Sequence, residues 1–278
     1  FMNSRIYRNT SGRKLAELCG FIPINSLRNN IKGDVLIRYG VSSYPTRDKD
    51  FRIVLNKAED IKRVINKKKA SLYMMLHNIK TPKIFLNKEE IARDNLPVLA
   101  RSNFHSRGTD IEIIDTMNKL RNSIADYYVE FIKGNLEYRL HVFNNEPIRL
   151  QKKIPKNGEH IIRNVEHGYI LADHYTHNIP IELQVIKEGL KAVKLFNLDF
   201  GAVDVLVGED NTPYILEINT APRLNKYGIQ LYAYYIKQYL GIEDSLNNYS
   251  RLKYNNGENG LPILFRDIIH RDRRNVYD

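Results

Sequence analysis

Three oxygen-bearing side chains in the last third of the chain have a spacing suited to metal binding: Asp204, Glu217 and Asn219. Residues 214–220, YILEINT, read as a β-strand, so Glu217 and Asn219 should lie on the same face of it. The preceding run, residues 201–207, reads as a second strand that carries Asp204. The opposite face of strand 214–220 would then be apolar, with Tyr214, Leu216 and Ile218.

The turn between these two strands sets their pairing, and residues 208–213, GEDNTP, have turn composition. If Val207 pairs with Tyr214, Asp204 lies directly across from Glu217, and paired side chains come within about 5 Å of each other. Two such carboxylates repel unless a cation neutralises them. Mg²⁺ prefers one or two carboxylates, completed by phosphate oxygens and water. The sequence therefore predicts a magnesium site here. The alternative is that both acids face solvent on an exposed hairpin.

The elements around this hairpin predict a mixed α+β fold. Apolar spacing, turn residues and capping residues define their bounds. Helices are expected at residues 11–20, 60–77, 116–121, 180–197 and 228–240. Strands are expected at 34–38, 84–86, 97–100, 126–132, 137–143, 147–153, 200–207 and 214–220, with a hairpin turn at Asn144, Asn145 and Glu146. The helix and strand at the start are too short for a full nucleotide-binding domain, so we expect a truncated α/β lobe there.

Composition and charge limit the class of protein. The 278 residues are 42% hydrophobic and 27% charged, as in ordinary globular proteins, and the net charge is +11. A basic field of this size attracts anions such as nucleotides, nucleic acid or acidic peptides, although solvated surface lysines explain it equally well. No apolar run approaches the ~18 residues that a membrane span needs. Cys19 is the only cysteine, which excludes an internal disulfide and leads us to expect a cytoplasmic protein.

The segment DFGAVDVLVGEDNTPYILEINTAPRL resembles the metal-binding end of the ATP-grasp superfamily. In that superfamily an acidic residue on one strand and an E-x-N on the next hold magnesium against nucleotide phosphates. The likeness is to ribosomal-protein glutamate ligases and to short ATP-grasp proteins encoded by phages, and it extends over roughly residues 66–224. It implies an ATP-grasp fold, in which two α+β lobes grip the nucleotide. We expect a truncated N-terminal α/β lobe at 1–58, the small lobe at 59–126, and at 127–278 the large lobe with the metal hairpin and a basic tail.

The resemblance also implies a set of nucleotide-binding residues. The segment YVEFIKGNLEYR, residues 128–139, is similar to the segment that receives adenine in the family. It would offer backbone groups to adenine, a carboxylate to the ribose hydroxyls and a guanidinium to phosphate or acyl groups. The backbone groups would come from Glu130, Phe131 and Ile132, the carboxylate from Glu137 and the guanidinium from Arg139.

Phosphate-binding residues follow from weaker likenesses. Lys67 resembles the lysine that opens the family's first nucleotide-contacting helix, and Asn164 the asparagine that completes the magnesium and phosphate shell. Lys152 or Lys153 would reach the nucleotide from the strand before Asn164. The chain has Arg101 where the family often has a lysine that reaches the α-phosphate. Arginine keeps the charge and binds phosphate through two N–H groups, but this departure puts the geometry in doubt. The following loop, with His105, Arg107 and Gly108, either covers the γ-phosphate or is an ordinary polar loop.

The activity that the resemblance implies is ATP-dependent formation of an amide from a carboxylate and an amine, through an acyl phosphate. Such chemistry needs positioning and charge neutralisation by Mg²⁺, or by Mn²⁺ in its place, rather than a covalent nucleophile. This agrees with the absence of a G-x-S-x-G motif. Arg139, Arg163 and Arg223 are candidates for stabilising the acyl phosphate or binding the acceptor, and structural salt bridges are the alternative for each.

Two other functions stay open. One is an ATP-grasp kinase that stops after phosphoryl transfer. The other is a basic nucleic-acid-binding protein, which the charge and 18 tyrosines favour, although no helix-turn-helix, RNP-like or zinc-finger motif is present. The absence of G-x-x-x-x-G-K-[ST] argues against a P-loop ATPase. The substrates are not readable from the sequence, but a basic enzyme favours an acidic peptide or amino acid.

Overall fold

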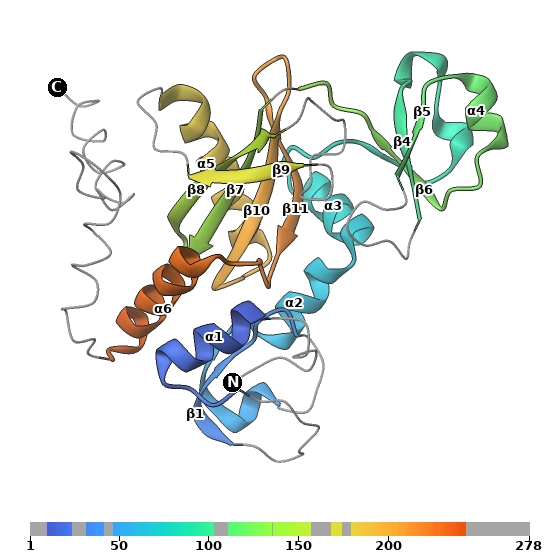
Figure 1. Cartoon of the computed structure of the whole chain (residues 1–278). Helices are drawn as coiled ribbons and strands as arrows, with labels where there is room; N and C mark the ends of the chain where they lie inside the picture. Colours follow the sequence, from blue (N-terminus) through green and yellow to red (C-terminus); the bar gives the residue numbers. More distant parts are fainter. Residues whose placement is uncertain are drawn as a thin grey trace.

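The computed structural model describes residues 10–23, 32–41, 47–102, 111–134, 136–156, 168–173 and 179–242. Their strands form three sheets, and Figure 1 shows the five-stranded sheet in the middle, the four-stranded sheet at the upper right and the two-stranded sheet at the bottom. No helix among these residues is long and apolar enough to span a membrane.

The five-stranded sheet is antiparallel throughout, and its strand order is β11-β10-β7-β8-β9. Asn144 and Asn145 both have positive φ, which is the conformation of a tight two-residue hairpin, so the hairpin predicted there is confirmed. One face of the sheet packs against the long helix α5, through the apolar core residues Val185 and Val193. The elements are β7 (Leu136–Phe143), β8 (Glu146–Pro155), β9 (Tyr169–Asp173), α5 (Ile179–Leu195), β10 (Phe200–Val207) and β11 (Pro213–Asn219).

The four-stranded sheet has the order β3-β6-β4-β5 and a small core of its own, which includes Phe85, Val98 and Tyr128. Its last strand, β6, hydrogen bonds with β3 and β4. We expected the boundary between the second and third regions at 126/127, just before β6, but the pairing puts β6 in this sheet. The elements are β3 (Ile84–Phe85), β4 (Val98–Arg101), β5 (Ile111–Ile114), α4 (Met117–Asn122) and β6 (Tyr127–Glu130), with 3₁₀ turns at Lys88–Glu90 and Arg93–Asn95.

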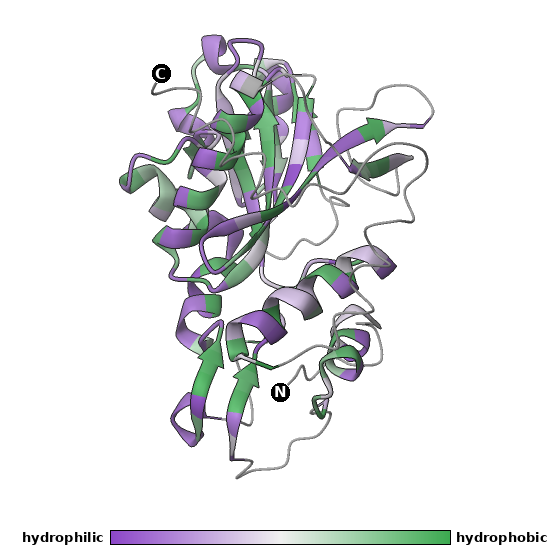
Figure 2. Ribbon diagram, turned by 90° about the vertical axis from the view of Figure 1, so that its left-hand side faces the viewer, coloured by the Kyte–Doolittle hydropathy of each residue, from purple (hydrophilic) through white to green (hydrophobic). Residues whose placement is uncertain are grey.

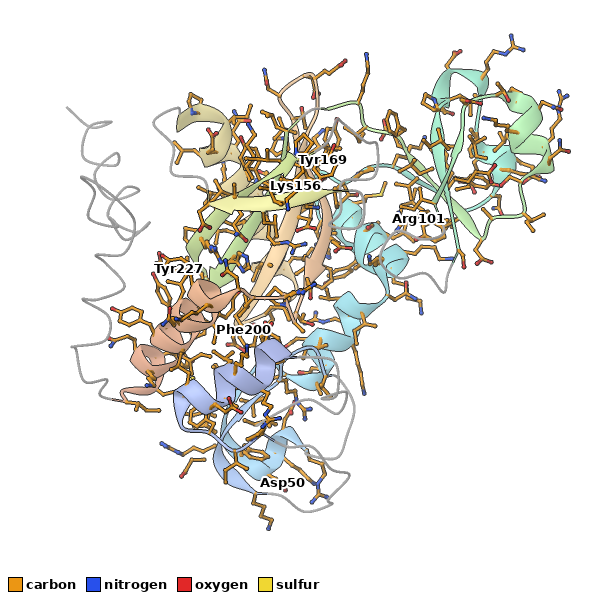
Figure 3. All side chains as sticks on the ribbon, in the orientation of Figure 1. Asp50, Arg101, Lys156, Tyr169, Phe200 and Tyr227 are labelled. Atoms are coloured by element: carbon orange, nitrogen blue, oxygen red, sulfur yellow. The ribbon has the colours of Figure 1, made fainter. Side chains whose placement is uncertain are left out.

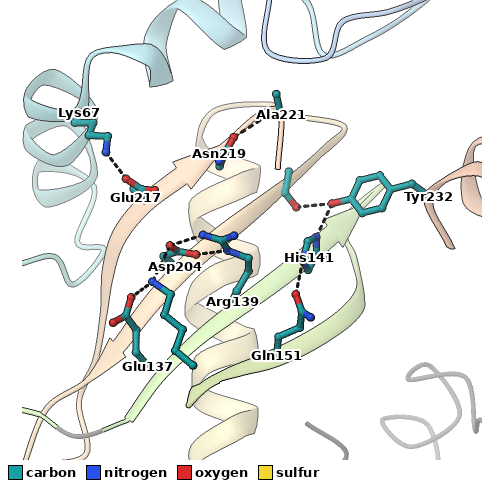
Figure 4. A network of polar contacts seen from close by, with 12 residues as sticks. Lys67, Glu137, Arg139, His141, Gln151, Asp204, Glu217, Asn219, Ala221 and Tyr232 are labelled. Atoms are coloured by element: carbon teal, nitrogen blue, oxygen red, sulfur yellow. Dashed lines mark hydrogen bonds and ion pairs between the residues drawn. The ribbon is translucent and has the colours of Figure 1, made fainter. Parts of the chain in front are cut away.

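Two helices, rather than the single helix predicted over 60–77, connect the sheets. α2 (Ala58–Ile65) ends at Asn66, whose extended backbone (ψ 100°) breaks the helix. The side chain of Asn66 then accepts a hydrogen bond from the backbone N–H of Lys69 and caps α3 (Lys67–Leu76). The break gives α3 a direction of its own (Figure 1), and Lys67, its first residue, points toward Glu217 on β11 (Figure 4).

The N-terminal elements share a core with the C-terminal helix. β1 (Gly33–Ile37) and β2 (Phe51–Leu55) form a parallel pair, preceded by α1 (Thr10–Cys19) and by a 3₁₀ turn at Asp48–Asp50. Both strands become apolar toward their C-terminal ends (Figure 2). These ends pack, together with α1, against α6 (Lys226–Leu240) and the aromatic end of the five-stranded sheet. Figure 3 shows that end at Phe200.

Candidate functional site

The hairpin of β10 and β11 brings Asp204 opposite Glu217, as predicted, but by a different register. Val207 pairs with Pro213, not with Tyr214, so the pairing that we assumed at the turn is wrong by one residue. A β-bulge after Asp204 leaves Leu216 as the extra residue and restores the Asp204–Glu217 pair. The bulge also changes which residues face the core. Ile215 and Ile218 are buried there, whereas Tyr214 and Leu216 are only partly buried.

Residues directly opposite one another form a polar row across the face of the sheet that lies away from α5. From β11 to β9 the row is Glu217, Asp204, Arg139, Gln151 and Asp173, and each residue is the register partner of the next. The alternation of side chains along each strand explains the row, because the neighbouring positions face the apolar core instead. Figure 4 shows the central part of this polar face.

Asp204 is the most strongly bound carboxylate of the row. Its side chain is only 7% exposed. Arg139 donates two parallel hydrogen bonds to it, from Nε to Oδ1 at 2.7 Å and from Nη2 to Oδ2 at 2.8 Å. Lys153 Nζ donates a third, to Oδ2 at 3.2 Å. Burial alone would raise the pKa of Asp204, but the two cations outweigh burial and hold it well below its usual range. Asp204 is therefore ionised at neutral pH.

Lys153 joins two strands of the same face. Its ammonium pairs with Glu137 as well as with Asp204, and its side chain is 11% exposed. Burial acts to lower the pKa of Lys153, but the two carboxylates raise it above its ordinary value, so the lysine stays charged. The sequence leaves Lys152 and Lys153 as alternatives for the lysine that reaches the nucleotide. Lys152 pairs with Tyr138, which lies in the core on the α5 side, so the structure places Lys153 rather than Lys152 beside Asp204.

Glu217 has a different kind of partner. The ammonium of Lys67, from the first turn of α3, pairs with Glu217 Oε2. This pair is much more open to solvent, with Lys67 40% exposed and Glu217 29% exposed. The structure thus brings Lys67, predicted from the sequence as a phosphate-binding residue, to the predicted metal site.

Asn219 makes a local hydrogen bond, and the segment after it is held by hydrogen bonds to the N-terminal elements. Asn219 Oδ1 accepts from the backbone N–H of Ala221 at 2.9 Å, which identifies that atom as the amide oxygen. Farther along, the Tyr39 hydroxyl donates to the Pro222 carbonyl, and Ser11 Oγ accepts from the Leu224 N–H at 2.9 Å. The N-terminal elements therefore anchor the segment that leaves the metal hairpin. Arg223 lies in this anchored segment with its side chain exposed.

The donor atoms fit a magnesium ion. A carboxylate has about four acceptor positions. Among the described residues, three donors occupy positions on Asp204, which leaves one on Oδ1, and Glu217 accepts only from Lys67. The Asn219 oxygen also keeps one lone pair. Among the residues that the structure describes, no three His, Cys, Asp or Glu side chains form a metal-binding group, so any ion here would rest on two carboxylates and an amide. Such a set, completed by phosphate and water, is what Mg²⁺ uses.

The predicted adenine-binding segment lies between the two larger sheets. The backbone N–H of Glu130 donates to the Lys83 carbonyl at 2.8 Å and is therefore not available to a base, which leaves the other backbone groups of Glu130, Phe131 and Ile132. Behind this segment, Gly134 lies directly against the turn of the metal hairpin. A Cβ on Gly134 would come within 2.1 Å of the Val207 carbonyl oxygen, so only glycine permits this approach.

Arg101 lies in the four-stranded sheet, where its register partner on β6 is Tyr127 (Figure 3). Burial raises the pKa of Tyr127, while a hydrogen bond and the charge of Arg101 act to lower it. The ammonium of Lys68 lies 5.3 Å from the centre of the Tyr127 ring. The first turn of α3 thus reaches both sheets, with Lys67 at Glu217 and Lys68 at Tyr127. Arg163, Asn164 and the loop residues His105, Arg107 and Gly108 lie outside the described residues.

Sequence reasoning missed the continuation of the polar face beyond Arg139. His141 is fully buried between the Tyr232 hydroxyl (3.0 Å from Nδ1) and Gln151 Oε1 (3.1 Å from Nε2). Gln151 Nε2 in turn donates to Asp173 at 3.2 Å, which places its amide oxygen toward His141 and the imidazole hydrogen on Nε2. Burial lowers the pKa of His141 to about 3, so it is neutral. The signal was present in the alternation Glu137, Arg139, His141 along β7.

Comparisons with known proteins bear on the fold. No protein-family model and no curated protein matches the sequence. A RiPP-associated ATP-grasp ligase from Chryseobacterium gregarium, in complex with ADP and a leader and core peptide, matches at 12% identity with a TM-score of 0.60, over 87% of this chain and 96% of that one. D-alanine–D-alanine ligase from Bacillus anthracis complexed with ATP matches at 16% identity with a TM-score of 0.58, over 84% and 86%. The macrocyclase MdnC from Microcystis aeruginosa MRC, bound with precursor peptide MdnA, matches at 14% identity with a TM-score of 0.57, over 82% and 95%.

Other matches are shorter. In a second structure of the Bacillus anthracis ligase the match covers 66% of that chain, and in two further ligase structures 57% and 42%, so this chain spans less than two thirds of those three. At such low identities the likeness concerns the fold, and it confirms the α+β architecture predicted from the sequence. The chain has the fold of the ATP-grasp ligases.

Proposed function

We propose that this protein is an ATP-dependent carboxylate–amine ligase. The observation that carries the proposal is the register pair of Asp204 and Glu217 on the polar face of a sheet that belongs to an ATP-grasp fold. Two adjacent carboxylates surrounded by three cations form a site for a metal-bound polyphosphate, because the carboxylates bind the metal and the cations bind the phosphates.

The residues of this chain divide the work of holding the nucleotide. Asp204, Glu217 and Asn219 would hold magnesium, which would supply positive charge to neutralise the phosphates. Residues 130–132 would receive adenine, and Glu137 the ribose hydroxyls. Lys67, Arg101 and Asn164 would contact the phosphates.

Arg139 and Lys153 would serve the reacting groups. Both are largely buried and are held by Asp204, so their charges are in place before any substrate arrives. A substrate carboxylate would attack the γ-phosphate of ATP, releasing ADP and forming an acyl phosphate. An amine would then attack the acyl carbon, lose a proton and expel inorganic phosphate, leaving the amide. Fixed positive charge beside the transferring phosphoryl group favours the first step and stabilises the phosphate that leaves in the second. Arg163 and Arg223 are proposed to bind the acyl phosphate or the acceptor carboxylate.

The substrates that we propose are amino acids or peptides. Two of the similar structures hold peptides, and a third is a D-alanine–D-alanine ligase. The net charge of +11 favours acidic acceptors among these.

The test is incubation with ATP, Mg²⁺ and pools of amino acids and peptides, followed by mass spectrometry for condensation products that have lost one water. For a product so identified, a carboxylate labelled with ¹⁸O should transfer one label to inorganic phosphate, because the acyl phosphate breaks at the acyl carbon. ADP release that needs the carboxylate but no amine, with a phosphorylated product, would instead identify a kinase.

A matched pair of variants links the activity to the polar face. Lys153→Met should slow condensation about 100-fold, a size typical of a lost electrostatic contact. Lys152→Met, which removes the neighbouring charge on the opposite side of β8, should leave the rate within about twofold. Equal effects of the two variants would contradict the assignment.

A further inference from the structure

The cations at the two predicted metal ligands differ in how firmly they are held. Arg139 and Lys153 project from strands of the same sheet as Asp204, and together they make three hydrogen bonds to it. Both side chains are at most 15% exposed. If Arg139 left Asp204, its buried charge would lose the bidentate partner, which is costly, and Lys153 is held by Glu137 as well as by Asp204. These two cations are permanent parts of the site.

Lys67 is held much less firmly. It comes from α3, outside the sheet, and among the described residues its ammonium forms one ion pair, with Glu217. The pair is open to solvent, and exposed ion pairs contribute little to stability. The flexible four-carbon stem of a lysine also lets the ammonium move without any change in the helix. Lys67 can therefore leave Glu217 at little cost.

A metal ion at Glu217 would force this movement. A divalent cation at Glu217 would repel the ammonium of Lys67 at short range, and Lys67, unlike the buried cations at Asp204, is able to move away from it. The metal is proposed to arrive with a triphosphate, which offers new oxygens to the displaced ammonium. The start of α3 is fixed by the Asn66 cap, so Lys67 stays within reach of whatever binds at the hairpin.

We propose that Lys67 is a placeholder cation: it neutralises Glu217 in the nucleotide-free protein and transfers to a phosphate oxygen when the metal–nucleotide complex binds. This inference rests on the proposed function. It has an unusual consequence, because the same side chain competes with the metal when the metal is alone and assists it when the nucleotide is present. Removing the ammonium should therefore change the two affinities in opposite directions.

The experiment measures Mn²⁺ binding without nucleotide, by electron paramagnetic resonance of the free ion, and Mg·ADP binding by calorimetry. Lys67→Gln should bind Mn²⁺ alone about two- to fivefold more tightly than the wild type, the gain expected from losing one exposed competing pair. It should bind Mg·ADP about five- to tenfold more weakly, because one charged hydrogen bond to phosphate is gone.

Two further variants serve as controls. Lys69→Gln removes the same charge two residues along α3, and since the hydrogen bond from Lys69 to Asn66 uses only its backbone N–H, both affinities should stay near those of the wild type. Lys67→Arg keeps the charge and should bind Mn²⁺ alone as weakly as the wild type does. Thermal unfolding verifies that each variant is folded.

The outcomes separate this inference from the proposed function. Unchanged or weaker Mn²⁺ binding by folded Lys67→Gln would overturn the placeholder role while leaving the metal site intact. An equal gain of Mn²⁺ affinity in Lys69→Gln would also overturn it. The gain would then come from the lower net charge of the protein and not from the loss of the Lys67–Glu217 ion pair. If the folded wild type bound neither Mn²⁺ nor Mg·ADP, the proposed function itself would fail, and the inference with it.

Discussion

Replacing Asp204 by Asn tests how far the polar face depends on one carboxylate. The substitution keeps the shape of the side chain but removes the charge that accepts three hydrogen bonds from Arg139 and Lys153. Lys153 keeps Glu137 as a partner, whereas Arg139 loses its bidentate acceptor. Because both groups of the Arg139–Asp204 pair are largely buried, breaking it should lower the free energy of unfolding by about 3–5 kcal/mol.

A double-mutant cycle isolates the contribution of the pair. We expect Asp204→Asn and Arg139→Gln together to cost about 2 kcal/mol less than the sum of the single variants, because the double variant leaves no buried charge from this pair unmatched. Urea denaturation at pH 7, followed by circular dichroism, gives the four free energies. The exposed pair Arg13 and Glu17 on α1 is the control, and its cycle should give only about 0.3–0.5 kcal/mol.

The reasoning fails if the Asp204 and Arg139 variants are additive to within about 0.5 kcal/mol, the scatter seen for independent sites. Additivity would mean that solvent, rather than the opposite charge, compensates each group. The bidentate contact would then not be a fixed element of the site.

Two other predictions concern the centre of the polar face and the adenine-binding segment. Because the pKa of His141 falls to about 3 on folding, from its ordinary 6.5, the unfolded chain binds the extra proton between these values. Stability from this group is fully present above pH 6.5 and should fall by up to about 1.4 kcal/mol per pH unit below it. Urea denaturation at several pH values gives the free energy of unfolding as a function of pH. This free energy should fall less steeply below pH 6.5 in His141→Asn than in the wild type, and an equally steep fall would contradict the assignment. Gly134→Ala would place a Cβ 2.1 Å from the Val207 carbonyl oxygen, so the backbone must move, at a cost of about 1–3 kcal/mol. ADP binding, measured by calorimetry, should weaken together with stability, and wild-type affinity would show that the segment does not hold the base.

The sequence predicted the hairpin of β10 and β11 because its signal is local, whereas the metal site on it stays a prediction. Alternation and turn composition fixed both strands and the facing pair of Asp204 and Glu217. The bulge was not predictable from alternation, since a single extra residue at Leu216 shifts the register without any change in composition. The predicted Val207–Tyr214 pairing was wrong by one residue, and the predicted β11 lacked the bulge. These two errors compensate each other, so the predicted pair of Asp204 and Glu217 is correct.

Other features depended on tertiary contacts that no local pattern encodes. The run 60–77 has helical character throughout, but the cap at Asn66 divides it, and its apolar residues Ile65 and Leu76 are exposed. The strands β2, β5 and β9 were not predicted, and each of them pairs with a neighbouring strand of its sheet. To choose between Lys152 and Lys153, one must know which of them lies on the face of β8 that is turned away from α5. Because side chains alternate along a strand, Lys153 lies on the same face as Gln151.

The central claim is that Glu217 and Asp204 together bind the divalent ion that carries the nucleotide. Glu217 is the better residue to change, because its partial exposure separates metal binding from folding. Mn²⁺ binding in the presence of ADP, titrated by electron paramagnetic resonance, should weaken about tenfold or more in Glu217→Gln, a loss of about 1.4 kcal/mol. Glu209→Gln, in the exposed turn of the same hairpin, should bind as the wild type does. Equal Mn²⁺·ADP affinity in wild type and Glu217→Gln would contradict the account.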